Sequence, residues 1–261
     1  MKKEYLYGIE VKDLTIGYTK PYRKVLHEKL NFAIPTGQLI SIIGGNGIGK
    51  TTLLRTLSKL EKPLNGKVFI QDSSLSDHST LEIARKLSLV LTHPPASKSI
   101  SVREFIALGR FPHTNWVGKL TSLDKEKINQ AIKATDVFEL LEYKCYQLSD
   151  GQYQRVAIAR AIAQDTPIIL LDEPTTHLDL YNRASILKLL KNLAQTHHKT
   201  ILFSTHEIEL ALQLSDKVLL LHSKEVKLGS PKEIIDSGTL DTLFPKDSIY
   251  FDSTEQRFKI I

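Results

Sequence analysis

The segment from residue 44 to residue 51 constrains the fold of this chain more than any other feature of its sequence. It reads GGNGIGKT and matches the pattern G-x-x-x-x-G-K-[ST]. An apolar run, QLISIIG, leads into it, and a helical pattern begins at Lys50. Glycines let successive backbone N–H groups converge on a phosphate, and the start of a helix adds partial positive charge. The segment therefore predicts a loop between a strand and a helix that binds a nucleoside triphosphate.

The side chains of this loop have separate expected roles. Lys50 should reach the β- and γ-phosphates, and Thr51 should place its hydroxyl on Mg²⁺. The alternative, a glycine-rich turn with an unrelated lysine, does not explain why the loop joins an apolar run to a helical pattern. The other loop residues that we expect to contact the nucleotide are Gly44, Gly45, Asn46, Gly47, Ile48, Gly49 and Thr52.

Short apolar runs alternate with helical patterns along most of the chain. GIEVKDLTIGY, EKLNFAI, KVFIQD and KLSLVL are typical of strands, and Thr80 is a candidate cap for a helix over Leu81 to Leu87. Residues 101 to about 142 are mainly helical in pattern. PIILLD, KTILFS and KVLLLH follow as buried-strand candidates separated by helical stretches, which is typical of a parallel sheet. The sequence predicts an α/β fold, with SIYFD and RFKII as a hairpin near the C-terminus.

Length and composition exclude several other classes. The chain has 261 residues, of which 41% are hydrophobic and 25% charged, so we expect neither disorder nor a coiled coil. No stretch approaches the roughly 18 apolar residues of a membrane span, and no signal peptide is expected. Cys145 is the single cysteine, which excludes an internal disulfide and is compatible with a reducing cytosol. The net charge of +6 indicates either a solvated basic surface or attraction to anionic lipid, nucleotide or nucleic acid.

An apolar run ending in two carboxylates forms the second candidate element of a site. Residues 168–173 read IILLDE. Ligands of open α/β sheets lie at the carboxyl ends of the strands, which is also where the glycine-rich loop begins. If the two strands are neighbours, Asp172 faces the same Mg²⁺, directly or through water, and Glu173 acts as general base on the attacking water. The alternative is a strand that stops at charged turn residues, with Pro174 ending it.

A serine and a glycine precede the strongest helical pattern of the chain. LSDGQ, residues 148–152, is followed by QRVAIARAIAQ. Ser149 should cap this helix, with Gln152 completing a capping box. A helix start of this kind, with Gly151 in its first turn, is also a natural seat for a γ-phosphate.

The order of these segments resembles the ATP-binding subunit of ABC transporters. GGNGIGKT, LSDGQ, ILLDEPTTHLD and STHE follow one another, with Tyr18 ahead of the first, and the resemblance extends from about Val11 to Gly229. A simple P-loop kinase has no LSDGQ segment, and the chain has no N-K-x-D guanine motif. The resemblance implies a P-loop NTPase fold with a RecA-like core, an antiparallel β subdomain and a helical subdomain.

The same resemblance implies a division of the single domain, residues 1–261, into parts. Residues 1–92 and 165–230 should form the catalytic core with the β subdomain. Residues 93–164 should form the helical subdomain that carries LSDGQ. Residues 231–261 should form a C-terminal helix and hairpin.

The resemblance also implies a head-to-tail homodimer with ATP and Mg²⁺ as cofactors. Each ATP should lie between Lys50 of one chain and Ser149, Gly151 and Gln152 of the other. Asp179 should cross the dimer interface.

Two further residues acquire roles from the resemblance. Tyr18 should stack on adenine, although it also fits an ordinary aromatic at the end of a strand. His206 should bind the γ-phosphate and hold the attacking water with Glu173, although it also fits an ordinary neighbour of a helix N-cap. The catalytic residues are thus Glu173, His206 and Lys50.

The branch that the chain resembles imports iron chelates, haem and cobalamin. VREFIALGRFPHTNW is the most telling segment, and in this family its region meets the membrane subunit. The resemblance implies separate permease subunits, an extracytoplasmic substrate-binding protein, and a location on the cytoplasmic face of the inner membrane through the permease. The alternative for the apolar residues of this segment is a core of the helical insertion. These residues are Phe105, Ile106, Leu108 and Trp116.

Two positions depart from the family pattern. Thr92, in KLSLVLTHPP, stands where a glutamine usually contacts Mg²⁺ or the water, and is a candidate third metal ligand. Glu207 follows His206 where aspartate is common, a change that looks mild.

Two other functions remain open from the sequence. One is another transporter class, such as an exporter or a zinc or manganese importer, because the ATPase contacts ATP rather than cargo. The other is a soluble ABC-type ATPase linked to nucleic acid, which the net charge favours. We expect the iron-chelate, haem or cobalamin importer, with no nucleic acid partner.

Overall fold

The computed structural model describes residues 5–20, 22–91, 99–222, 226–243 and 249–260. A six-stranded sheet with the order β10-β9-β3-β8-β7-β6 lies at its centre. The strands from β9 to β6 run parallel, and β10 pairs antiparallel at the edge. Every residue of β3, β7 and β8 is buried, as expected for parallel strands covered on both faces. The strands are β3 Leu39–Ile43, β6 Leu87–Val90, β7 Ile168–Leu171, β8 Thr200–Ser204, β9 Lys217–Leu221 and β10 Val226–Gly229.

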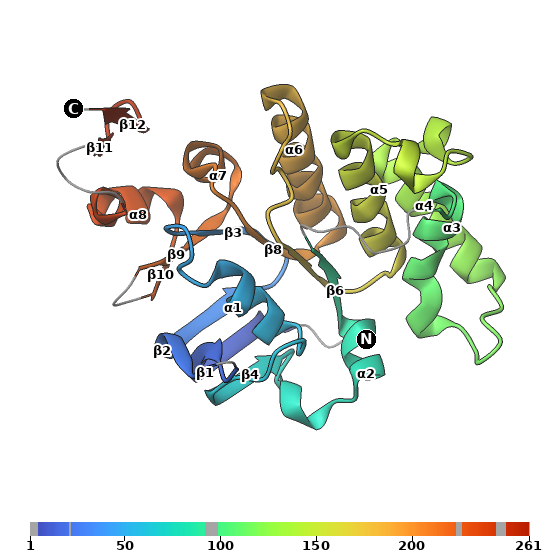
Figure 1. Ribbon diagram of the computed structural model, residues 1–261, viewed down its shortest axis with the longest axis horizontal. Helices are drawn as coiled ribbons and strands as arrows, with labels where there is room; N and C mark the ends of the chain where they lie inside the picture. The colour runs from blue at the N-terminus through green and yellow to red at the C-terminus, as the bar shows by residue number, and fades with distance from the viewer. Residues whose placement is uncertain (1–4, 21, 92–98, 223–225, 244–248, 261) are drawn as a thin grey trace.

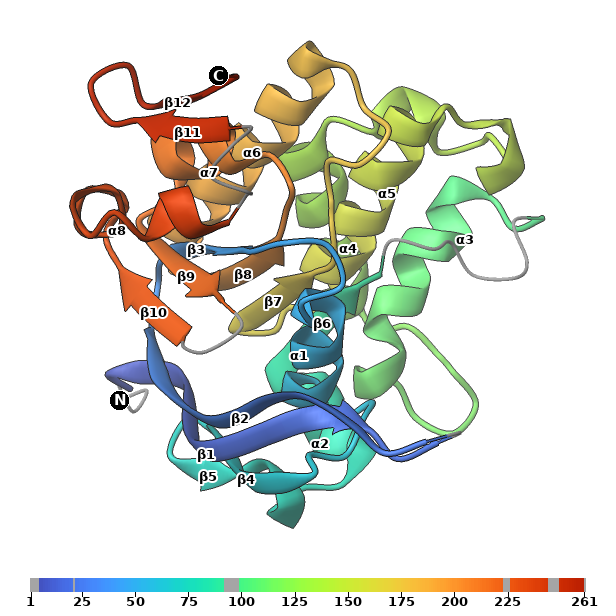
Figure 2. The ribbon, with the colours of Figure 1, turned by 60° about the vertical axis from the view of Figure 1, so that its left-hand side comes forward.

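A second sheet, antiparallel and with the order β2-β1-β4-β5, holds most of the N-terminal part. Helix α1 lies between the two sheets (Figures 1 and 2). Leu53, Leu54 and Leu57 of α1 share one apolar core with residues of both sheets. The elements of this part are β1 Tyr7–Tyr18, β2 Lys24–Pro35, α1 Lys50–Leu57, β4 Asn65–Ile70, β5 Ser73–Ser74, the 3₁₀ helix η1 Leu75–Asp77 and α2 Thr80–Lys86.

Two helices cover the face of the six-stranded sheet that is opposite α1. Alternate residues of β8 show the two faces: Leu202 packs in the core that contains α1, whereas Ile201 and Phe203 pack with α6. This alternation follows from the two-residue period of a strand. The covering helices are α6 Leu180–His197 and α7 Ile208–Leu214.

The described residues between β6 and β7, from 99 onward, are mainly helical and pack beside α6 at one end of the sheet (Figure 1). Its last helix, α5, begins at the capping box predicted from the sequence, with Ser149 as N-cap and Gln152 as its reciprocal partner. The elements are α3 Val102–Ala107, η2 Leu108–His113, α4 Ser122–Thr135, η3 Phe138–Leu140, η4 Cys145–Gln147 and α5 Asp150–Ala163.

The C-terminal part forms a third, smaller core. Phe251 and Phe258 of a two-stranded hairpin pack with Ile208 and Leu212 of α7, which confirms the predicted hairpin. The elements are α8 Pro231–Asp236, η5 Thr239–Thr242, β11 Ile249–Asp252 and β12 Arg257–Ile260.

Two local expectations were wrong. The helix near residue 80 begins at Thr80 and is capped by Ser79, because Ser79 and Glu82 form a capping box at the required spacing. Of the four apolar residues taken as a possible core of the insertion, Phe105 and Ile106 are buried, but Leu108 and Trp116 are exposed. Among the residues that the structure describes, no helix combines the length and apolar character needed to cross a bilayer.

Candidate active site

The glycine-rich loop leads from β3 into α1, as the sequence predicts. Gly49 is the N-cap of α1 and has φ of 112°, a backbone conformation that residues with a side chain rarely adopt. Gly44 has φ of 156°, and a Cβ there would lie 2.6 Å from the carbonyl oxygen of Leu221. A Cβ on Gly45 would meet nothing within 4 Å. The backbone therefore requires glycine at Gly44 and Gly49, whereas Gly45 is sterically free.

Lys50, the first residue of α1, is buried and holds its ammonium group against the loop. Its Nζ donates hydrogen bonds to the carbonyl oxygens of Gly44 (3.0 Å) and Gly45 (3.3 Å). Burial lowers the pKa of Lys50, and the charges of Glu173 and Asp172 partly oppose this shift. A cation is thus fixed at the loop, where an incoming phosphate would find it.

Asp172 joins the loop to the end of β7. Thr51 Oγ1 donates a hydrogen bond of 2.9 Å to Asp172 Oδ1, and Ser204 Oγ donates one of 2.8 Å to the same oxygen. The strands β3 and β7 are not neighbours, because β8 lies between them. Asp172 nevertheless contacts Thr51 directly.

Glu173 has a left-handed backbone, with φ of 50°, which is uncommon for a residue with a side chain and marks local strain. Its N–H donates to Ser204 Oγ at 2.9 Å, and Thr176 Oγ1 donates to its Oε2 at 3.0 Å. Its Oε1 lies 2.5 Å from Nε2 of His206. Three residues therefore fix the carboxylate and the backbone of Glu173 in one orientation.

His206 follows β8 and completes this group. Its Nδ1 lies 3.5 Å from Nζ of Lys50. A neutral imidazole with its proton on Nε2 fits both contacts, because Nε2 then donates to Glu173 and Nδ1 accepts from Lys50. The imidazole of His206 thus contacts both the ammonium group of Lys50 and the carboxylate of Glu173.

A hollow of about 360 Å³ opens over these side chains, a volume in the range of small-molecule sites. Tyr18, at the end of β1, lines its rim and holds its hydroxyl 2.6 Å from Thr52 Oγ1. The lining residues are Tyr18, Asn46, Gly47, Ile48, Gly49, Lys50, Thr51, Thr52, Glu173 and His206.

Six of the predicted nucleotide-binding residues do not line this hollow: Gly44 and Gly45 at the start of the loop, and Ser149, Gly151, Gln152 and Asp179. Ser149 and Gln152 bind one another in the capping box, with Gln152 N donating to Ser149 Oγ at 3.3 Å. Gly151 lies in the same helix turn. Asp179 caps α6, accepting from Asn182 N at 2.8 Å, and the hydrogen bonds from Asn182 lower the pKa of Asp179. Ser149, Gln152 and Asp179 are exposed.

Thr92, the candidate third metal ligand, lies outside the described residues. Ser204 was not predicted, although it binds both Asp172 and Glu173. The argument that identified Asp172, a polar residue at the carboxyl end of an apolar strand, applies equally to KTILFS and identifies Ser204.

The oxygen atoms of Thr51 and Asp172 fit a magnesium ion. They lie 2.9 Å apart beside the loop, and Mg²⁺ prefers one or two protein oxygens together with substrate phosphates. No group of three or more His, Cys, Asp or Glu residues suited to a metal occurs within the described ranges. A magnesium ion held by Thr51 and Asp172 would therefore take its remaining ligands from the phosphates.

Comparisons with known proteins agree with this geometry. A family model described as ABC transporter matches residues 27–176. The achromobactin transport ATP-binding protein CbrD of Dickeya dadantii (strain 3937) is 37% identical over 241 residues, covering 92% of this chain and 88% of that protein. The ferric enterobactin transport ATP-binding protein FepC of Escherichia coli (strain K12) is 35% identical, covering 88% of this chain and 84% of that protein.

Solved structures extend the likeness to the fold. A metal-chelate type ABC transporter in an inward-facing conformation matches with a TM-score of 0.81 and 29% identity, covering 98% of both chains. A dimeric bacterial ABC transporter cassette matches with a TM-score of 0.74 and 28% identity, covering 85% of this chain and 98% of that one. The chain therefore belongs to the ABC transporter family.

Proposed function

We propose that this chain is the ATP-hydrolysing subunit of an importer for an iron chelate. The contact of 2.5 Å between Glu173 and His206, beside the phosphate loop, is the observation that carries the hydrolytic part. Several relatives support the cargo, since their names include transport of achromobactin and of ferric enterobactin. Haem and cobalamin are the other cargoes that the sequence resemblance implies.

Hydrolysis in this site depends on positioning and charge. Lys50 exchanges its bonds with loop carbonyls for the β- and γ-phosphates. Glu173, held by Thr176 and Ser204, accepts a proton from the attacking water. When ATP is bound, the Nε2–H of His206 would turn from Glu173 to the γ-phosphate, which frees Glu173 Oε1 for the attacking water.

Thr51 and Asp172 would hold Mg²⁺ in this account. The ion would supply positive charge against the phosphate oxygens. The hydrogen bond of 2.9 Å between Thr51 and Asp172 supports this assignment, because it joins the two proposed ligands. From its position in the sequence, Thr92 is proposed as a third protein ligand of the ion.

The site requires a second copy of the chain. Ser149, Gly151 and Gln152 lie at the start of α5, away from their own hollow, and the side chains of Ser149 and Gln152 are exposed. In a head-to-tail homodimer they would contact the γ-phosphate held by the partner's loop, and Asp179 would cross the interface. The match to a dimeric cassette supports this arrangement.

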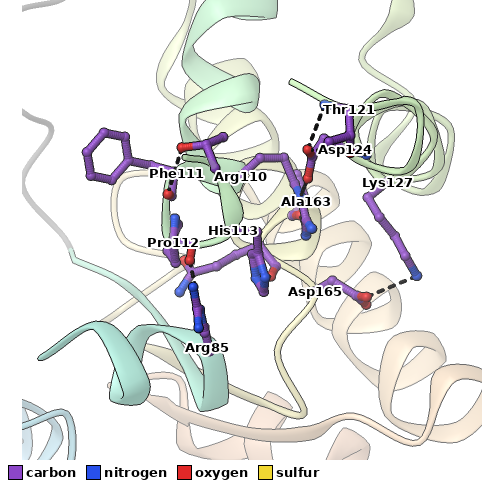
Figure 3. Close-up of polar contacts among 12 residues, drawn as sticks. Arg85, Arg110, Phe111, Pro112, His113, Thr121, Asp124, Lys127, Ala163 and Asp165 are labelled. Carbon is purple, nitrogen blue, oxygen red and sulfur yellow. Dashed lines mark hydrogen bonds and ion pairs between the residues drawn. The ribbon is translucent and has the colours of Figure 1, made fainter. Parts of the chain in front are cut away.

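The segment around η2 is proposed to meet the permease. Figure 3 shows how polar contacts fix it: Arg110 Nε pairs with Asp124 Oδ1 at 2.9 Å, and Arg85 Nε donates to the carbonyl of Pro112 at 2.8 Å. The aromatic side chains of this segment are nevertheless exposed to solvent: Phe111 is 71% exposed and Trp116 is 96% exposed. Large aromatic side chains on a fixed support are typical of the centre of a protein interface.

Residues 1–92 and 165–230 form the catalytic core with the β subdomain, 93–164 the helical subdomain, and 231–261 the C-terminal addition. The chain is bound to the cytoplasmic face of the inner membrane through its permease, and an extracytoplasmic protein delivers the chelate.

Glu173→Gln tests the hydrolytic assignment. The variant keeps the size of the side chain but cannot accept the proton, so it should bind ATP, stop turning over and accumulate as a dimer. Size-exclusion chromatography with ATP, alongside steady-state phosphate release, measures both effects. Turnover at the wild-type rate would remove Glu173 from the role of general base. ATPase activity stimulated by polynucleotide would instead favour the nucleic-acid alternative.

A further inference from the structure

Arg183, in the first turn of α6, joins two segments that are distant in sequence. Its Nε donates a hydrogen bond of 2.6 Å to the carbonyl oxygen of Leu178, and its Nη1 donates one of 2.6 Å to Oε1 of Glu207. About two thirds of each charged side chain is covered, with 31% of Arg183 and 34% of Glu207 exposed. Because the guanidinium is planar, two bonds in different directions fix its orientation.

Glu207 directly follows His206, so the ion pair acts on the loop that carries the imidazole. The N–H of Glu207 donates to Thr205 Oγ1 at 2.9 Å, and Glu207 is the N-cap of α7. The side chain of Glu207 makes no capping bond to its own helix. It binds Arg183 instead, which ties the start of α7 to the start of α6.

The other end of this connection lies at the surface expected to meet a second copy. Arg183 binds the carbonyl of Leu178, the residue before Asp179. A Cβ placed on Gly151 would lie 3.5 Å from Asn182 and 3.6 Å from Leu178. The first turn of α6 therefore touches the helix start that carries the LSDGQ segment, while Arg183 links that turn to the loop of His206.

We infer that Arg183 and Glu207 are a positioning pair for ATP hydrolysis, which holds His206 against Glu173. The inference rests on the proposed function. Neither residue lines the hollow over the phosphate loop, so the pair acts through His206 and not on the nucleotide. The glutamate that stands where aspartate is common thus has a reason: its longer side chain reaches Arg183.

Charge-neutral and charge-exchanged variants of the full chain test this inference. Arg183→Met and Glu207→Gln should each lower kcat about fivefold while leaving the KM for ATP within about twofold, because only the orientation of the imidazole changes. The double variant should be no slower than either single variant, since both remove the same contact. Exchanging the charges, with Arg183→Glu and Glu207→Arg together, should recover part of the loss.

A matched control separates this effect from a general loss of an ion pair. Arg103 of α3 pairs with Glu142 at 3.1 Å and also joins distant segments. Arg103→Met should leave kcat and KM unchanged. Thermal unfolding of all variants shows whether each remains folded at the assay temperature.

A second readout does not need turnover. In NMR spectra of the nucleotide-free protein with isotope-labelled histidine, the ring nitrogen resonances of His206 report its hydrogen bond to Glu173. Arg183→Met should shift or broaden them, and Arg103→Met should not. An unchanged His206 spectrum, or kcat losses that simply add in the double variant, would overturn the inference. Wild-type turnover in Glu173→Gln would instead overturn the proposed function, so the two failures are distinguishable.

Discussion

Arg110→Met removes one partner of the buried ion pair that fixes η2 to the neighbouring helices. Both side chains of the pair, Arg110 and Asp124, are 4% exposed. Arg110 also donates from Nη1 to the carbonyl of Ala163 at 2.8 Å, at the end of α5. The substitution leaves a buried carboxylate without its cation and a helix carbonyl without its donor.

The expected loss of stability is about 3 kcal/mol, the low end of the range for breaking a buried pair, because Asp124 keeps other partners. Thr121 donates to Asp124 Oδ2 from N at 2.8 Å and from Oγ1 at 2.7 Å. Burial acts to raise the pKa of Asp124, but the hydrogen bonds from Thr121 and Arg110 outweigh it and lower that pKa to about 2.

Because the pKa of Asp124 is lowered in the folded state, the effect of Arg110→Met on stability should depend on pH. The folded pKa lies below the unfolded value of 3.8, so the stabilisation by Asp124 is complete above that value. It is lost as the pH falls through the folded pKa. The difference in unfolding free energy between wild type and Arg110→Met should therefore be largest near neutral pH and shrink at acidic pH.

Urea unfolding measures this difference in unfolding free energy, with the same dependence on urea concentration expected for both proteins. The exposed pair of Arg103 with Glu142 is the control, and Arg103→Met should cost less than about 1 kcal/mol. If Arg110→Met costs no more than this control, or if its effect does not change between neutral and acidic pH, the buried pair does not stabilise η2 as described.

Five other substitutions test the phosphate loop, the proposed adenine contact and the proposed docking segment. Gly44→Ala should lower the unfolding free energy by more than about 2 kcal/mol in a thermal or urea assay, since its Cβ would meet Leu221, and Gly45→Ala should leave it unchanged. Tyr18→Ala should weaken ATP binding roughly tenfold by calorimetry, and Tyr18→Phe much less, if the ring stacks on adenine. Trp116→Ala should reduce co-sedimentation with membranes that contain the permease while the ATPase activity of the free chain stays the same, and equal co-sedimentation would move the docking surface elsewhere.

Most of the site is predictable from the sequence because its chemistry is local. The glycine-rich loop needs a strand before it and a helix after it, and both are visible as patterns around residues 44–51. The capping box at Ser149 is likewise a matter of spacing. Such features do not depend on which strand lies beside which.

Features that depend on the tertiary arrangement were missed. The order of strands places β8 between β3 and β7, and only this order brings Ser204 to Asp172 and Glu173. The pair of Arg183 with Glu207 joins residues from two helices, and no local pattern marks it. Trp116 was a possible core residue of the helical insertion, but its side chain is 96% exposed.

Uptake in cells that lack this chain tests the central claim most directly. The cells receive labelled ferric siderophore and either the wild-type chain or Glu173→Gln, with expression of both checked. If the chain drives a siderophore importer and Glu173 is its general base, uptake should be lost without the chain and restored only by the wild type. Normal uptake in cells carrying Glu173→Gln alone, when the chain itself is required, would contradict the account.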